Sequence, residues 1–211
     1  GEPLVVEDLE PAAVGPRDVL VRIAASGICH TDLTVIAGRS PLPLPIVPGH
    51  EACGQVEEVG PEVRRVRPGN RVLAAVSPAC GACWWCVNGM SNHCERGPAI
   101  LATPRFELPD GRAARAVCGC GSFAEAMVVD EASLIPVETD LPDDQLALLG
   151  CGVTTGLGAA LVTAGVTAGA SVAVIGCGGV GQSVIQGAGI AGAATIVAVD
   201  PEAARREAGG G

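Results

Sequence analysis

Three side chains in separate parts of the sequence have types that bind a transition-metal ion. His50 lies in a Gly-His-Glu triplet, Cys29 in the segment GICHTD and Cys151 in a Gly-Cys-Gly triplet. One imidazole and two thiolates form a Cys₂His set, which suits a zinc ion that keeps its fourth position open. The carboxylates of Asp32 and Glu51 lie close in sequence to two of these residues, where groups that orient or exchange with ligands are expected. The set therefore predicts a reactive metal centre.

A second cluster contains cysteine alone, in the pattern C-x₂-C-x₂-C-x₇-C, at Cys80, Cys83, Cys86 and Cys94. Such short spacings let successive thiolates converge on one tetrahedral ion, and a closed Cys₄ set has a structural role. Paired disulfides or scattered buried thiols are the alternative. The opening segment GEPLVVEDLEP is acidic and interrupted by proline, unlike a secretory signal. We therefore expect a reducing, cytoplasmic compartment and a second zinc ion.

The overall composition is acidic. The chain has 211 residues, a net charge of −10 and 13 cationic side chains, all of them arginine. This balance argues against nucleic acid or an anionic membrane as a partner. The length suffices for one large domain or two modest ones.

A long stretch without charge, residues 145–199, resembles a membrane-spanning segment by hydropathy alone. The stretch is rich in glycine and threonine and divides into short pieces. A parallel strand that is covered on both faces also reads as a continuous apolar run. We therefore expect buried strands and helices here rather than a membrane span.

Secondary structure in the first part of the chain is predicted to be mainly β. Short β-branched or alternating segments predict strands at 19–25, 53–59, 70–76 and 122–129. The proline-rich segment 41–49 must be extended, because residues before proline avoid helix.

Two helices are predicted after these strands. The acidic side chains in residues 141–144 (LPDD) favour a helix start, because they interact well with the positive end of the helix dipole. This helix leads to the triplet around Cys151, and a second apolar helix is predicted at 154–164.

The last part of the chain has the pattern of a nucleotide-binding βαβ unit. A strand at 171–175, a helix at 180–191 and a strand at 195–199 surround a G-x-G-x-x-G motif. The motif contains Gly176, Gly178, Gly179 and Gly181. These glycines permit a tight turn and the close approach of a pyrophosphate to the helix N-terminus. Asp200 can accept hydrogen bonds from the adenosine ribose, which favours NAD over NADP. An ordinary glycine-rich turn is the alternative.

These motifs occur in the order found in the zinc-dependent medium-chain alcohol dehydrogenase family, which the whole chain resembles. The CHTD segment and the loop with Asp110-Gly111 are most similar to the glutathione-dependent formaldehyde dehydrogenase (class III) branch. Alcohol dehydrogenase is itself the known case of a Cys₂His catalytic zinc, so that ligand set is not independent of the resemblance.

The resemblance implies a fold of two parts. Residues 1–150 would form an α+β, GroES-like, β-rich catalytic domain, with the structural-zinc lobe at 80–94. Residues 151–211 would form the first part of an α/β Rossmann domain, a doubly wound parallel sheet that binds NAD. Full-length relatives would be homo-oligomers, either dimers or tetramers.

The resemblance also implies roles for single residues. Cys29, His50 and Cys151 would hold catalytic zinc, and the four clustered cysteines would hold structural zinc, which gives two zinc ions per chain. Glu51 would approach the catalytic metal, and Asp32 would fix the tautomer of His50. The residues assigned to the proton path and the cofactor are Thr31 as the proton acceptor, His30 near the pyrophosphate, Thr155 and Val180 around nicotinamide, and Arg205 beside the adenosine ribose.

Each of these residues also has an ordinary structural interpretation. His50 could be a hydrogen-bonded core histidine, Cys29 and Cys151 could be buried thiols, and Thr31 could cap a helix. For the other thiols, Cys53, Cys118, Cys120 and Cys177, we predict packing alone.

Two features depart from the family pattern. Thr34 stands where some relatives have a histidine that carries the proton outward, so the relay would end in water or in His30. The chain also stops at Gly211, early in the Rossmann domain. We therefore expect a fragment, a truncated gene product or an incomplete chain.

The leading functional hypothesis is an NAD-dependent oxidoreductase for a primary alcohol or a thiol–aldehyde adduct. The alternatives are a non-catalytic, truncated zinc-binding fragment of such an enzyme, and a dehydrogenase of polyols or secondary alcohols. For the enzyme the expected partner is a small-molecule alcohol or aldehyde substrate, and we expect neither a nucleic-acid nor a membrane partner.

Overall fold

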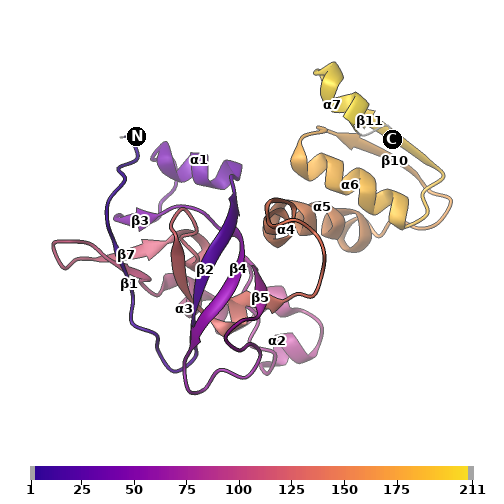
Figure 1. The fold of residues 1–211 in the computed structure, drawn as a ribbon. Helices are drawn as coiled ribbons and strands as arrows, with labels where there is room; N and C mark the ends of the chain where they lie inside the picture. The colour runs from indigo at the N-terminus through magenta and orange to yellow at the C-terminus, as the bar shows by residue number, and fades with distance from the viewer. Residues whose placement is uncertain (1–2, 209–211) are drawn as a thin grey trace. The chain divides into compact units, whose positions relative to one another are not determined.

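The computed structural model describes residues 3–208, and the chain divides into two compact units, Gly1–Gly150 and Cys151–Gly211 (Figure 1). The first unit contains mainly β-strands. The second contains a parallel strand pair with helices.

The first unit is built on a five-stranded antiparallel sheet in the order β8-β2-β4-β5-β9. Its strands are β2 (Asp18–Gly27), β4 (Glu51–Val59), β5 (Arg71–Ala74), β8 (Ala126–Asp130) and β9 (Leu134–Pro136). Alternate side chains from these strands point into one core, in which Val19, Val21, Val72 and Leu134 are fully buried. Valine dominates this core, as expected for a chain with few aromatic residues.

A four-stranded sheet in the order β1-β6-β7-β3 forms the second layer of this unit. Its short strands are β1 (Glu10–Pro11), β3 (Ile46–Val47), β6 (Phe106–Glu107) and β7 (Ala113–Ala116). Phe106 packs on Val47, Ala114 and Ala116 in a separate small core.

Short helices connect these strands. The α-helices of the first unit are α1 (His30–Ile36), α2 (Trp84–Val87), α3 (Gly97–Ala102) and α4 (Asp143–Leu148). Single 3₁₀ turns occur at Ser91–His93, Val117–Gly119 and Glu131–Ser133.

The predictions for the first three strands and for the helix start at 141–144 are confirmed, within a few residues at each end. The strand predicted at 122–129 begins later, at Ala126. The reason is that the backbone N–H groups of Ser122 and Phe123 donate to the carbonyls of Gly49 and Pro48, both at 3.0 Å. This segment therefore packs on the turn before β4 instead of joining the sheet.

The second unit contains the predicted βαβ pattern. Strands β10 (Ser171–Ile175) and β11 (Thr195–Val199) pair in parallel, and α6 (Gly179–Ile190) connects them. The other helical segments that belong to or lead into this unit are π turns at Leu149–Val153 and Ala159–Thr163, α5 (Thr154–Gly158) and α7 (Ala203–Ala208).

The helix predicted at 154–164 is present, but it continues from α4 without a break. The resulting run, Asp143–Thr163, is 21 residues long and is apolar enough to cross a membrane by length and composition. Its first part packs in the first unit, where Leu146 and Ala147 are buried against Cys53. Core helices of water-soluble proteins pass the same test, so this run is weak evidence for a membrane span.

The valine-rich core of the first unit leads to a stability prediction. Leu134 is fully buried on β9, whereas its neighbour Ile135 is 44% exposed. We expect Leu134→Ala to lower the free energy of unfolding by about 2–5 kcal/mol, because it removes buried methyl groups and leaves a cavity. The matched variant Ile135→Ala should lower the free energy of unfolding by well under half as much. Urea unfolding followed by circular dichroism would measure both, and equal losses would contradict this assignment of the core.

Candidate metal centres and cofactor loop

The antiparallel pairing of β2 with β4 brings two of the predicted zinc ligands together. In this pairing Gly27, the last residue of β2, lies opposite Glu51, the first residue of β4. Cys29 is the N-cap residue of α1 just beyond β2, and His50 directly precedes β4. The candidate ligand atoms of Cys29, His50 and Glu51 lie within 4.8 Å of one another.

A buried carboxylate, Asp32, connects the two segments that carry these ligands. Its Oδ1 accepts a hydrogen bond from the backbone N–H of Gly49 (2.9 Å) and lies 3.1 Å from Nδ1 of His50. Its Oδ2 accepts a hydrogen bond from the backbone N–H of Cys29 (3.1 Å). Burial alone would raise the pKa of Asp32, but these hydrogen bonds lower it below its usual value. An ionised carboxylate beside Nδ1 favours a proton on Nδ1, which leaves Nε2 of His50 available to a metal.

The Cys29 thiol is also prepared for metal binding. Burial acts to raise its pKa, but hydrogen bonds from the backbone and side chain of Thr31, together with the contact to His50, lower the pKa below the usual value. The thiolate is the form of cysteine that binds metal ions. The chemistry of this donor set therefore fits zinc.

The predicted proton-path residues lie at the start of α1. The side chains of His30 and Thr31 are both exposed to solvent. The hydroxyl of Thr34 donates to the carbonyl of His30 at 3.0 Å. Thr34 is thus bonded back onto its own helix.

Close packing surrounds the carboxylate of Glu51, which is 4% exposed. A Cβ atom on Gly27 would lie 2.3 Å from Oε2 of Glu51 and 2.9 Å from a methyl group of Leu148. Glycine is therefore needed at position 27, where β2 approaches both Glu51 and the end of α4.

Cys151 is the first residue of the second unit, and one peptide bond joins it to Gly150. Gly150 packs tightly on β5, because a Cβ atom there would lie 2.1 Å from the carbonyl oxygen of Ala74. Consecutive Cα atoms are about 3.8 Å apart, so the backbone position of Cys151 is limited by that of Gly150. The assignment of Cys151 as a ligand stays a prediction.

The four clustered cysteines converge at one point of the first unit. The sulfur atoms of Cys80, Cys83, Cys86 and Cys94 all lie within 4.8 Å of one another, and all four thiols are free. The Sγ atoms of Cys80 and Cys86 are 3.9 Å apart, too far for a disulfide. Four sulfurs at about 2.3 Å from one zinc ion would be roughly 3.8 Å apart, so the spacing fits a tetrahedral site.

Backbone N–H groups favour thiolates in this cluster. The N–H groups of Ala82 and Cys83 point at the sulfur of Cys80 and lower its pKa. The pKa values of Cys83 and Cys94 are also lowered, whereas burial raises that of Cys86 to about 12. Several thiolates this close repel one another, and a bound cation would neutralise them.

Among the remaining thiols, Cys53, Cys120 and Cys177 are buried, in keeping with the packing role predicted for them. Cys118 differs, because it is half-buried and has a left-handed backbone conformation (φ 51°). Burial, together with the charges of Asp32 and Cys29, raises the pKa of Cys118 to about 11. It therefore lies near the first candidate metal centre, which the sequence did not indicate.

The glycine motif of the second unit forms the turn between β10 and α6. Gly176 has a positive φ of 93°, and Gly178 is the N-cap residue of the helix. A Cβ atom on Gly181 would lie only 1.9 Å from the carbonyl oxygen of Gly176. The turn is therefore tight enough to require glycine, and it leaves the N-terminus of α6 available to an anion.

Asp200 directly follows β11 and is linked to this turn. Its Oδ2 accepts a hydrogen bond from the backbone N–H of Cys177 (2.8 Å), and its Oδ1 accepts one from Glu202 (2.9 Å). These hydrogen bonds lower the pKa of Asp200. The guanidinium of Arg205 lies 3.9 Å away. The carboxylate thus has a structural role in addition to the ribose contact predicted for it.

The two residues predicted around nicotinamide lie on different helices of this unit. Thr155 is on α5, and Val180 is in the first turn of α6 and is 45% exposed. The two helices touch through glycine, because a Cβ atom on Gly156 would lie 2.5 Å from the carbonyl oxygen of Val180.

Comparison with known proteins bears on these sites. Residues 15–139 match the family model of the alcohol dehydrogenase GroES-like domain, which is more than half of the chain. This chain belongs to the medium-chain alcohol dehydrogenase family. The match confirms the predicted family and the GroES-like part of the predicted fold.

Two relatives in this family are equally similar in sequence. An NDMA-dependent alcohol dehydrogenase of Amycolatopsis methanolica is 42% identical over 98% of this chain and 57% of its own length. An S-(hydroxymethyl)glutathione dehydrogenase of Saccharomyces cerevisiae is also 42% identical, over 94% of this chain and 54% of its own length. The chain therefore spans a little over half the length of these alcohol dehydrogenases.

Solved structures agree with this assignment. An alcohol dehydrogenase zinc-binding domain protein from Burkholderia ambifaria matches 99% of this chain and 58% of its own, with a TM-score of 0.91 and 36% identity. The benzyl alcohol dehydrogenase of Acinetobacter calcoaceticus matches 96% of this chain and 56% of its own, with a TM-score of 0.84 and 32% identity.

The position of Asp32 leads to a prediction about metal affinity. Asp32→Ala would leave the backbone N–H groups of Cys29 and Gly49 without their acceptor and would release the ring of His50. We expect the zinc affinity of this centre to fall about 10–100-fold, as for other residues that orient a metal ligand. Competition with a chromophoric chelator would measure the affinity.

The matched control is Asp110→Ala, which removes an exposed carboxylate that bonds Arg112 in a surface turn. It should leave the affinity unchanged. An Asp32→Ala variant that binds zinc as tightly as the control would contradict the orienting role of Asp32.

Proposed function

We propose that this chain supplies the metal centres and the first cofactor-binding segment of an NAD-dependent alcohol dehydrogenase. The observation that carries the proposal is the group formed by Cys29, His50 and Asp32, in which a buried carboxylate presents one imidazole nitrogen next to a thiolate. The substrate class proposed is a primary alcohol or a thiol–aldehyde adduct.

Cys29, His50 and Cys151 would hold a catalytic zinc ion, and Glu51 would serve as an exchangeable neighbour. The four clustered cysteines would hold a structural zinc ion and keep their loop folded. When bound, zinc and NAD supply polarisation of the alcohol oxygen and a hydride acceptor.

The residues of the chain would act around these groups as follows. Asp32 keeps His50 in one tautomer and one orientation. The Thr31 hydroxyl, which is exposed and follows Cys29 by two positions, accepts the proton of the alcohol and passes it to water or to His30. Both residues reach solvent at the start of α1, which supports either exit.

The second unit would hold the cofactor. The pyrophosphate would bind at the N-terminus of α6, over Gly178 and Gly179. Asp200 and Arg205 would contact the adenosine ribose, and Thr155 and Val180 would pack around nicotinamide. A carboxylate at position 200 repels a 2′-phosphate, which supports NAD rather than NADP.

An assay of catalytic turnover tests this proposal. The zinc-loaded chain would be mixed with NAD and a panel of primary alcohols, secondary alcohols and hydroxymethyl-thiol adducts, and NADH would be followed by absorbance. We expect NADH from a primary alcohol or an adduct, abolished by a zinc chelator. His50→Ala should lower the rate roughly 100-fold or more, because it removes the oriented ligand of a Lewis-acid centre.

His93→Ala is the control, since His93 packs against Trp85 in the cysteine lobe and is not assigned to the reaction. A preference for secondary alcohols would assign the chain to a different substrate class. Zinc binding at both centres without any NADH would contradict catalysis by this chain and favour the non-catalytic alternative.

A further inference from the structure

A pair of serine hydroxyls joins the end of β2, which leads to Cys29, to the segment at Ser122, which packs on the turn before His50. The Oγ atoms of Ser26 and Ser122 are 2.8 Å apart, although the residues are 96 positions apart in sequence. Ser26 lies near the end of β2, three residues before Cys29, and is half-buried. Ser122 is only 1% exposed.

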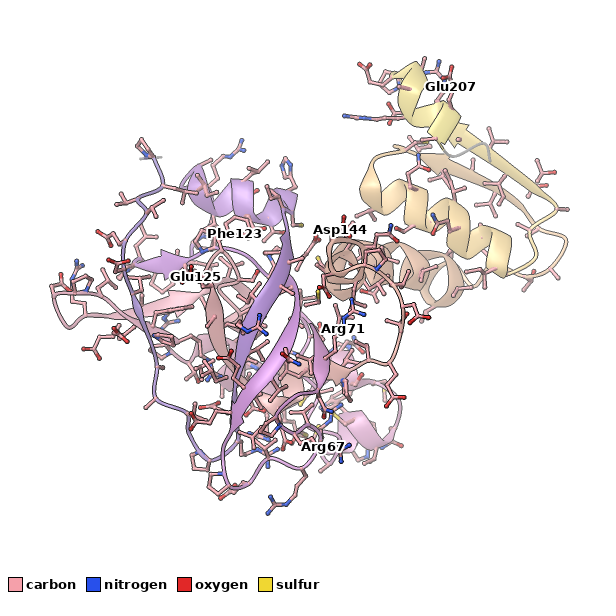
Figure 2. All side chains as sticks on the ribbon, viewed as in Figure 1. Arg67, Arg71, Phe123, Glu125, Asp144 and Glu207 are labelled. Carbon is pink, nitrogen blue, oxygen red and sulfur yellow. The ribbon has the colours of Figure 1, made fainter. Side chains whose placement is uncertain are left out.

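Ser122 also contacts the turn that leads to His50. Its backbone N–H donates to the carbonyl of Gly49 at 3.0 Å, and the N–H of Phe123, labelled in Figure 2, donates to Pro48 at the same distance. A Cβ atom on Gly49, which has a φ of 92°, would lie 2.6 Å from Oγ of Ser122 and 2.5 Å from the backbone nitrogen of Phe123. The Gly49 turn therefore packs directly on the segment at Ser122.

The turn is thus held from two directions. On one side the carboxylate of Asp32 accepts a hydrogen bond from the N–H of Gly49, and on the other side the backbone N–H of Ser122 donates to the carbonyl of Gly49. The Asp32 contact fixes the start of α1 relative to His50. The contact between Ser26 and Ser122 fixes the end of β2 relative to the same turn.

We propose that the Ser26–Ser122 hydroxyl pair is a positioning device for the metal centre at Cys29 and His50, an inference that rests on the proposed function. The pair keeps the two ligand-bearing segments at a fixed separation before a metal binds. Because both groups are neutral hydroxyls, they bridge the segments without adding a charge or a competing thiolate near the ion.

Removal of one hydroxyl has a specific consequence. In Ser26→Ala the hydroxyl of Ser122, which is 1% exposed, loses its neighbour, and an unpaired buried polar group is costly. In Ser122→Ala the half-buried hydroxyl of Ser26 keeps only its 3.4 Å contact to the carbonyl of Gly27 within its own strand. The β2 end and the Gly49 turn then separate more easily, so that metal binding must first restore their spacing. Preorganisation of this kind acts on affinity for the metal rather than on the chemistry of the ligands.

The test is a cobalt(II) titration of the wild-type chain and the variants Ser122→Ala, Ser26→Ala and the double variant, followed by visible absorption. The cysteine lobe of the same molecule is expected to bind cobalt as well and would provide an internal reference. We expect each single variant to weaken binding at the Cys29–His50 centre about 3–10-fold, with the lobe unchanged. The double variant should bind cobalt only slightly more weakly than either single variant, because the two residues act through one contact.

Two further variants separate positioning from general stability. Ser133 is also 1% exposed, but its hydroxyl has no hydrogen-bond partner among the described residues, so Ser133→Ala removes an equally buried hydroxyl without breaking a bond. It should leave both cobalt sites unchanged. Ser122→Thr keeps the hydroxyl and should restore most of the affinity.

Equal cobalt affinities of Ser122→Ala and Ser133→Ala at the Cys29–His50 centre would overturn the positioning role. A parallel loss of affinity at both cobalt sites would overturn it too. Neither result would contradict the proposed function. If Ser122→Ala does not fold, the half-buried Ser26→Ala gives the same comparison. A wild-type chain that binds cobalt at the lobe and nowhere else would instead overturn the proposed function, and this inference with it.

Discussion

The structure around the candidate reactive centre depends on one buried carboxylate. Asp32 accepts hydrogen bonds from the backbone on both sides of the centre and also contacts the ring of His50. An ionised group that is fully buried is expensive unless it is fully hydrogen-bonded, so the three donors must stay in place for the unit to remain stable. The geometry that orients the ligand is therefore the same geometry that satisfies the buried charge.

The cysteine lobe, residues 80–94, is anchored to the rest of the first unit at both of its ends. The chain enters the lobe beside Ala79, whose N–H donates to the carbonyl of Ala132, and leaves it beside Arg96, which pairs with Asp130 at 3.1 Å. Both ends of the lobe thus dock on residues 130–132, at the end of β8 and in the turn that follows it. A metal ion held by the four cysteines would close the loop between these ends, and the sheet would fix where the loop sits.

Much of this could be predicted from the sequence, because the informative signals are local. The spacing of the four cysteines and the glycine turn before α6 are determined by neighbours in the chain, and both appear as predicted. The strand predicted at 122–129 is present, but its predicted start was wrong, because residues 122 and 123 bond to Gly49 and Pro48, which are distant in sequence. The Ser26–Ser122 contact and the position of Cys118 near Asp32 were missed for the same reason. They arise from tertiary packing, and serine and cysteine are common enough that neither stands out in a sequence.

Zinc content is the most direct test of the claim that this chain carries two distinct metal centres. Elemental analysis of the purified wild-type chain, His50→Ala and Cys86→Ser would count the ions in each. The structure predicts two zinc ions in the wild type and one in each variant, since each substitution removes a ligand from a different group. A His50→Ala variant that retains as much zinc as the wild type would contradict the reactive centre at Cys29 and His50.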